Sequence, residues 1–377
     1  GVWIMAYTTI DDPSEYFQAQ TYTGNNSDGL AITNSGNSNL QPDWLWIKKR
    51  SGSGQHVLVD STRGANKQLF TSLSDTEQTS TEFVASLDTD GFTLNDNSSG
   101  TGDTNATNGG TYVAWNWKAN GGTTSTNNDG SITSTVQANT TAGFSILTYS
   151  ANATAGATVG HGLGTTPSVV ILKKRSGTGD GNWLVGHKNF VGNSAENLIF
   201  DSNGAVASAD DAAGSTWNRT AFTSTVFTLG DGQAGDYTGR TNRSGYSMVA
   251  YCFAEIKGYS KFGKYTGNGV SNNGTFAYTG FLPSWVMIRR TDSGASWLIF
   301  DNKRGATNMV SQRLYANDAQ GEDTGTADGM DFVSNGFKIR SSTGSSSSSN
   351  ASGATYIYMA FAEHPFVSSK GVPVTAR

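Results

Sequence analysis

Large apolar residues alternate with small or polar ones in three short segments, at residues 113–119, 249–255 and 357–363. In the first segment Val113, Trp115 and Trp117 are the large residues. A period of two places such side chains on one face of a β-strand. The pattern therefore predicts half-buried antiparallel strands. We expect their other face, which carries Ala114 and Asn116 in the first segment, to be solvated or lightly packed.

Other strand-length apolar runs recur in the same order. A strand led by proline occurs at 42–50, 167–175 and 283–290, and a second strand follows at 56–60, 183–187 and 297–301. A third set is found at 91–94, 226–229 and 336–339, and a Phe followed by a Tyr-containing turn precedes each copy, at Phe17, Phe144 and Phe262. Landmarks that recur in order indicate one module of about 100–115 residues, present three times.

Repeats of this size made of short strands predict an all-β protein of three tandem antiparallel β-sandwiches, of the lectin or jelly-roll kind. We expect inward aromatic side chains to fill the gap between the two sheets of each sandwich. The expected divisions are an N-terminal arm at 1–16, sandwiches at 17–125, 140–258 and 259–366, and a C-terminal tail at 367–377.

The joints between repeats differ in length. Residues 119–130 read as a long polar linker, whereas the joint at 257–261 is short. We therefore expect repeats two and three to be coupled more rigidly than repeats one and two. The apolar segment 2–7 lies outside the repeats and is predicted to dock on a neighbouring chain or on another repeat.

Composition narrows the classes of function. Glycine accounts for 47 of 377 residues and charged residues for 15%, which disfavours long amphipathic helices. The net charge of −5 provides no basic region for nucleic acid, and no apolar run could span a membrane. No secretory signal is expected at the first residues. The single cysteine, Cys252, cannot form an internal disulfide, in agreement with assembly in a reducing cytoplasm.

Signatures of catalysis are weak. The glutamates do not form the paired carboxylates of a sandwich glycosidase. We expect His56 and His187 to be structural, and Cys252 to be an ordinary strand residue. Residues 88–91, Asp-Thr-Asp-Gly, suit a tight turn better than a calcium site. The basic triplet at 48–50 and its counterparts are expected to be strand-end charges that protect sheet edges. No catalytic residue, metal ligand or cofactor is therefore predicted.

A recognition surface is the remaining candidate site. Proteins bind carbohydrates through exposed aromatic rings that stack on sugar faces, with Asn, Asp and Arg supplying hydrogen bonds. The second repeat has an elaborated, glycine-rich region between its middle strands. Its candidates for an exposed glycan-recognition surface are Trp217, Tyr237, Arg240, Arg243 and Tyr246. The alternative is that Trp217 packs beneath its own loop.

Several motifs resemble a known group of proteins. They are residues 5–17 with the Tyr-Thr-Gly-Asn turn at 22–25, the Trp-Ile-Lys-Lys-Arg strand at 46–50, the Asp-Ser-x-Arg-Gly-Ala turn at 60–65 and the C-terminal residues 362–377. Together they resemble structural proteins of tailed phages, abundant in marine and cyanobacterial viruses and described as tail or tail-fibre proteins, sometimes with a concanavalin-like sandwich. Residues 1–4 precede the apparent start of the resemblance.

The resemblance implies a non-enzymatic virion protein, part of a tail fibre or another particle appendage. It would assemble in the host cytoplasm with other virion proteins and with copies of itself, and attachment to a host surface glycan is a further expected role. Two alternatives stay open. A capsid decoration protein would contact the shell through one repeat, and a tail-associated polysaccharide-degrading enzyme would place two carboxyl groups roughly 5–9.5 Å apart in a cleft.

Overall fold

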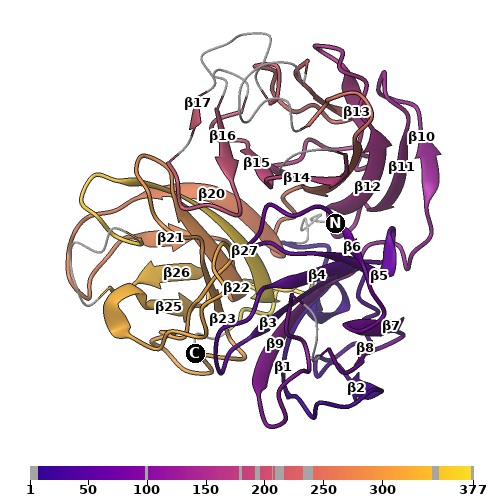
Figure 1. Ribbon diagram of the computed structural model, residues 1–377. Helices are drawn as coiled ribbons and strands as arrows, with labels where there is room; N and C mark the ends of the chain where they lie inside the picture. Colours follow the sequence, from indigo (N-terminus) through magenta and orange to yellow (C-terminus); the bar gives the residue numbers. More distant parts are fainter. Residues whose placement is uncertain are drawn as a thin grey trace.

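The computed structural model describes residues 7–97, 101–177, 181–191, 196–205, 207–208, 216–231, 241–341 and 348–374. The protein is all-β, with 43% strand and 2% helix, and its sheets are antiparallel, as predicted. In the described residues the strands form three pairs of sheets, and each pair belongs to one repeat (Figure 1). The helical content includes two short 3₁₀ turns, η1 (Pro13–Glu15) and η3 (Thr326–Asp328).

Each pair combines a large sheet with a small one. In the first repeat the large sheet has the order β1-β9-β3-β4-β5-β6 and the small sheet β2-β8-β7. Their bounds are β1 Phe17–Thr23, β2 Leu30–Ile32, β3 Trp44–Lys49, β4 Val57–Asp60, β5 Gly64–Leu69, β6 Gln78–Thr79, β7 Val84–Asp88, β8 Gly91–Leu94 and β9 Thr111–Trp117.

The second repeat has the large sheet β10-β11-β12-β19-β14-β15-β16-β17 and the small sheet β13-β18. Their bounds are β10 Ser125–Asn127, β11 Ser134–Asn139, β12 Phe144–Ser150, β13 Thr158–Gly160, β14 Val169–Ser176, β15 Leu184–His187, β16 Glu196–Ile199, β17 Ala207–Ser208, β18 Val226–Thr228 and β19 Ser247–Phe253.

The third repeat has the large sheet β20-β27-β22-β23-β24 and the small sheet β21-β26-β25. Their bounds are β20 Ser260–Thr266, β21 Phe276–Tyr278, β22 Phe281–Arg290, β23 Leu298–Asp301, β24 Leu314–Tyr315, β25 Met330–Val333, β26 Gly336–Ile339 and β27 Thr355–Pro365. The strands expected from the apolar runs are therefore present in all three repeats.

Each repeat encloses an apolar interior of its own between its large and small sheets. In the first repeat Leu45 on β3, Phe92 on β8 and Ala114 on β9 share one buried cluster. Separate clusters occupy the corresponding space in the second and third repeats. This arrangement matches the sandwich prediction, because the two faces that meet inside each repeat are both apolar.

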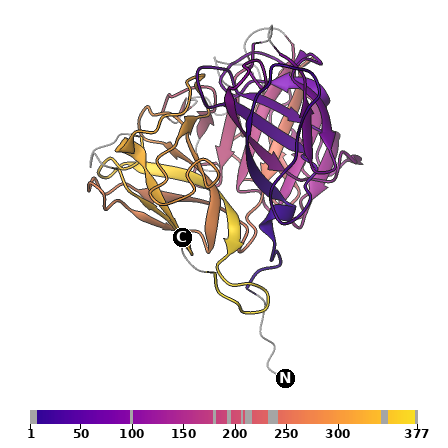
Figure 2. The same cartoon turned by 90° about the horizontal axis from the view of Figure 1, so that it is seen from below.

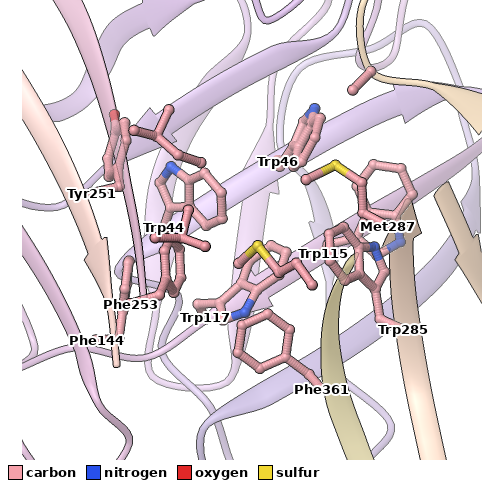
Figure 3. Close-up of a cluster of buried hydrophobic side chains, with 14 of the residues drawn as sticks. Trp44, Trp46, Trp115, Trp117, Phe144, Tyr251, Phe253, Trp285, Met287 and Phe361 are labelled. Atoms are coloured by element: carbon pink, nitrogen blue, oxygen red, sulfur yellow. The ribbon is translucent and has the colours of Figure 1, made fainter. Parts of the chain in front are cut away.

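A fourth cluster joins the three repeats at the centre of the molecule. The large residues of the alternating strands point into it, including Trp115 on β9, Tyr251 on β19 and Met359 on β27. Figure 3 shows the tryptophans of the first repeat meeting Phe144, Tyr251 and Phe253 on one side and Trp285, Met287 and Phe361 on the other. Seven of the nine tryptophans lie in this cluster: Trp44, Trp46, Trp115, Trp117, Trp183, Trp285 and Trp297.

Aromatic residues line the interior of each sandwich, as expected, including Phe92, Phe227 and Phe337. The large residues of the alternating strands, however, fill the space between the sandwiches. One expectation about these strands was wrong. The opposite face of the strands is not lightly packed, since Ala114, Asn116 and Cys252 are fully buried. The reason is that the large sheets are covered on both faces: small residues fit the narrow interior of the sandwich, and bulky ones fill the wider centre of the ring.

The segment expected to be a linker is fixed in place. Its residues 125–127 form β10, and the carboxylate of Asp43 accepts hydrogen bonds from the backbone N–H groups of Ala119, Gly121 and Gly122 at 2.6–3.0 Å. Gln137 on β11 also accepts from the Gly122 N–H, at 2.7 Å. These contacts do not support the expected looser coupling of repeats one and two.

The N-terminal arm docks on the third repeat and on the joint that precedes it. The Tyr7 hydroxyl donates to the Gly280 carbonyl at 2.8 Å, and the Thr8 hydroxyl donates to the Lys257 carbonyl at 3.0 Å. Asp11 accepts from the backbone of Ser369 at 2.6 Å, so the N-terminal arm also contacts the segment that follows the third repeat. Figure 2 shows the arm leaving the first repeat at the lower edge of the molecule. Docking on another repeat was one of the two predicted outcomes, and residues 1–6 of the same segment lie outside the described residues.

Candidate functional site

The structure buries two of the five residues predicted to form a recognition surface. Trp217 is only 1% exposed and packs edge-on against Phe222 and Phe227, which is the alternative interpretation given above. Tyr246 is 7% exposed, and its ring is covered by the Lys174 ammonium at 4.6 Å. Arg243 is exposed and also lies over this ring, at 5.8 Å from its centroid. Tyr237 and Arg240 lie outside the described residues.

The acidic turn at 88–91 uses its carboxylates internally. Asp88 accepts hydrogen bonds from the hydroxyls of Ser86 and Thr93, and Asp90 accepts from the Leu40 backbone N–H. Gly91 has a φ of +103°, a conformation that suits glycine in a tight turn. Among the described residues no group of three His, Cys, Asp or Glu side chains could hold a metal ion.

Equivalent residues close the three seams of the molecule. We call these seam 1–2, seam 2–3 and seam 3–1, after the repeats that meet there. At each seam a ring N–H from the start of the second strand points at a backbone carbonyl of the preceding repeat. In that order the pairs are Trp183–Phe70, Trp297–Ile199 and His56–Tyr315, at 2.8, 3.1 and 2.8 Å. The repeats therefore form a closed ring with pseudo-threefold symmetry (Figure 1).

A buried cation crosses each seam at another equivalent position. Each cation lies near the end of β14, β22 or β3, and its side-chain nitrogen donates to a backbone carbonyl of the preceding repeat. For seams 1–2, 2–3 and 3–1 the donor and acceptor residues are Lys173 and Leu73, Arg289 and Gly204, and Lys48 and Ala319. Burial lowers the pKa of Lys48 to about 7 and that of Arg289 to about 10. The expectation that this basic segment protects sheet edges was wrong, because the three strands are interior strands and these cations face a neighbouring repeat.

Carboxylates complete two of the seams. At seam 1–2, Asp60 accepts from Arg63 at 2.5 Å and from the Tyr251 hydroxyl at 2.7 Å, while Glu77 bridges Arg63 and Arg175. Burial acts against the charge of Glu77, but the two guanidinium groups outweigh it and lower its pKa. Seam 3–1 has the same arrangement. Asp301 accepts from Arg304 and from the Trp115 indole, and Glu322 bridges Arg304 and Arg50.

Seam 2–3 departs from this pattern. His187 stands where the other repeats have the buried aspartate, and Thr291 stands where they have the bridging arginine. Burial lowers the pKa of His187 to about 3, which keeps its ring neutral. A partly exposed ion pair of Glu255 and Lys261 crosses this seam, and an open cleft of about 270 Å³ lies beside Phe190.

A second open cleft, of about 180 Å³, lies at seam 3–1. Its polar lining includes Asp12, Asn302, Lys303, Glu363 and His364. The carboxylate of Asp12 is already occupied by the hydroxyls of Ser14 and Ser38, at 2.6 and 2.8 Å. The buried carboxylates and arginines of seams 1–2 and 3–1 have defined partners within the ring. At seam 2–3, Arg289 donates to the Gly204 carbonyl, while its Nε and Nη1 have no hydrogen-bond partner among the described residues.

An aromatic pair on the outer surface of the third repeat was missed by sequence reasoning. Phe276 and Tyr278 on β21 are 44% and 53% exposed, and they lie on the outward face of the small sheet. The signal was present in the sequence, because the equivalent positions of the other repeats hold small residues. It becomes visible only when the β2, β13 and β21 strands are aligned through their pairing partners.

The chain belongs to a family defined by one shared domain. A family profile described as "Domain of unknown function (DUF7483)" matches residues 12–365, which include the strands of all three sheet pairs. No curated protein and no solved structure matches the chain significantly. Within the described residues, no helix is long and apolar enough to cross a membrane.

Proposed function

We propose that this protein is a non-enzymatic structural component of a tailed-phage particle, part of a tail fibre or a similar appendage. Its work is assembly with other virion proteins and attachment to a host surface. The observation that carries the proposal is the closed ring, in which the aromatic centre and the buried charges of the seams serve to hold three sandwiches together. The resemblance of both termini to phage structural proteins supports the same conclusion.

A rigid ring suits a particle component for a physical reason. In a ring made from one chain, the three seams cannot separate on dilution, because the repeats are held at a high effective concentration. The outer loops can then vary without disturbing the packed centre. Ring N–H groups and cations take equivalent places at all three seams, which supports a role of the seams as interfaces between the repeats.

The test is to locate the protein in purified particles of a phage that encodes it. We expect mass spectrometry to find the chain in stoichiometric amounts, and gold-labelled antibody to mark the tail region in electron micrographs. Label distributed over the head would identify a capsid decoration protein instead. Absence of the chain from intact particles would contradict the proposal, and release of soluble fragments from host capsule would favour the enzyme alternative.

A further inference from the structure

The exposed apolar side chains are concentrated in one repeat. Among the described residues, the large hydrophobic side chains with the greatest exposure are Val270, Phe276, Tyr278 and Val372, all in the third repeat or the tail that follows it. Phe276 and Tyr278 are two positions apart on β21, so their rings project from the same side of the small sheet. We call this pair the β21 aromatic face.

The fold does not require aromatic residues at these positions. The strands β2, β13 and β21 are aligned by Ile32, Val159 and Ala277, which pair with equivalent phenylalanines on the neighbouring strands. On this alignment the equivalent positions hold Ala31 and Thr33 in the first repeat, both exposed, and Phe276 and Tyr278 in the third. The second repeat holds Thr158 and Gly160, and Gly160 is buried beneath the Asn127 side chain. Since the first repeat leaves this face exposed without aromatic rings, their presence in the third points to an interaction.

Polar groups surround the β21 aromatic face. The Tyr278 hydroxyl lies 3.2 Å from that of Tyr7, which is held in place by its bond to the Gly280 carbonyl. Lys338 is the cross-strand neighbour of Phe276, and its ammonium donates to the Asn273 side chain at 2.6 Å. Hydroxyl, ammonium and amide groups thus stand at the edges of an apolar platform.

The size of the face indicates what it binds. An aromatic side chain buries about 150–250 Å² in full, so two half-exposed rings offer roughly 200 Å². A specific protein interface buries about 800 Å² on each partner, several times more. An area of roughly 200 Å² suits one or two sugar rings. The C–H faces of sugars stack on aromatic rings, and their hydroxyls bond to amide, ammonium and phenol groups.

We propose that the β21 aromatic face is a saccharide-binding site. Phe276 and Tyr278 form the stacking platform, Lys338 and Asn273 bond sugar hydroxyls, and Tyr7 positions the Tyr278 hydroxyl. This inference rests on the attachment role proposed above and gives it a ligand class and a location. It replaces the region around Trp217, whose ring is buried, as the candidate for glycan recognition.

The test uses saturation-transfer NMR with hexasaccharides of glucose, galactose and N-acetylglucosamine. We expect at least one to receive saturation from the full-length chain. The double variant Phe276→Ala with Tyr278→Thr, which copies the residues of the first repeat, should bind at least tenfold more weakly and melt at an unchanged temperature. Ala31→Ser, at the equivalent position of the first repeat, is the matched control and should bind as the original chain does.

Three results would overturn the site: no transfer to any of the hexasaccharides, equal binding by the double variant, or loss of self-association in the double variant by sedimentation. The last would identify a protein interface. Failure of the proposed function is distinguishable, because it is read from the presence of the chain in particles. A chain that binds sugar but is absent from particles would leave this site intact.

Discussion

At the scale of single residues, the repeats place large and small side chains differently at the same two positions on neighbouring strands. In the first repeat Trp46 packs beside His56, and the Trp46 indole donates to the His56 ring at 2.8 Å. In the third repeat Met287 and Trp297 stand at the same two places. The total bulk stays similar, and in each case a ring nitrogen faces a carbonyl of the preceding repeat. Volume-conserving exchanges of this kind are tolerated in well-packed cores.

This exchange predicts how acid stability depends on His56. Burial holds the pKa of His56 well below its usual 6.5. Below about pH 6.5, His56 is therefore protonated in the unfolded chain but stays neutral in the folded chain. Stability is intact above pH 6.5 and falls on acidification, by up to about 1.4 kcal/mol per pH unit for one such group.

The double variant Trp46→Met with His56→Trp copies the third repeat and removes this group. We expect it to fold, with its new indole donating to the Tyr315 carbonyl, and to lose less stability between pH 6.5 and pH 5 in urea titrations. His364→Gln, at an exposed histidine, is the control and should leave the slope unchanged. If the double variant loses as much stability between pH 6.5 and pH 5 as the original chain, the acid sensitivity does not come from His56.

At the scale of elements, the strands that close each repeat are buried on both faces. The sequence revealed β9, β19 and β27 by their alternation but could not say which core each face meets. A large sheet in a sandwich usually has one face in water, so the small residues were assigned to solvent. Only the packing of three large sheets against one another explains why both faces are covered.

The joint after β9 gives a prediction at this scale. Asp43 is the acceptor for three backbone N–H groups at 119–122 and for the Ser61 hydroxyl. Asp43→Ser, which copies Ser168 and Ser284 at the equivalent positions, should leave the N–H groups of Ala119 and Gly121 without an acceptor, whereas the Gly122 N–H keeps its bond to Gln137. We expect a loss of about 2 kcal/mol in unfolding free energy and faster hydrogen exchange at 119–122. Ser284→Ala is the control and should cost under about 1 kcal/mol; slow exchange in Asp43→Ser would show that the carboxylate is not the anchor.

At the scale of the whole molecule, the ring is one cooperative body. Trp285 of the third repeat contacts Trp46, Trp115 and Trp117 of the first at ring-centroid distances of 5.5–6.5 Å. Residues of all three repeats share that cluster, so separating the repeats would expose their largest aromatic side chains together. Domains joined by so apolar an interface are not expected to move or unfold independently.

We therefore expect one calorimetric transition, with equal van't Hoff and calorimetric enthalpies. Trp285→Ala should lower the unfolding free energy by about 3–5 kcal/mol and keep the transition single, because the cavity opens in the shared centre. Trp217→Ala removes an indole from the interior of the second repeat alone and serves for comparison. Resolved transitions in the unmodified protein would refute the cooperative ring.

The candidate site, too, could be predicted only in part from the sequence. Trp217 was chosen because it is aromatic and lies among glycine-rich turns, features that a buried loop residue shares with an exposed one. Phe276 and Tyr278 attracted no attention, because two aromatic residues in alternation are also what a buried strand contains. Exposure distinguishes these cases, and it depends on which neighbours cover each side chain.

By itself, the sequence determined the all-β class, the threefold repetition and the positions of most strands. These follow from alternation and turn residues, which act over a few neighbours and are visible in one copy of the module. Only the tertiary structure decided that the repeats close into a ring, that the tryptophans fill its centre, and that the basic strand ends lie in seams. These features depend on contacts between residues 100 or more positions apart, such as Lys48 with Ala319, and no local pattern specifies which distant surface will cover a given face.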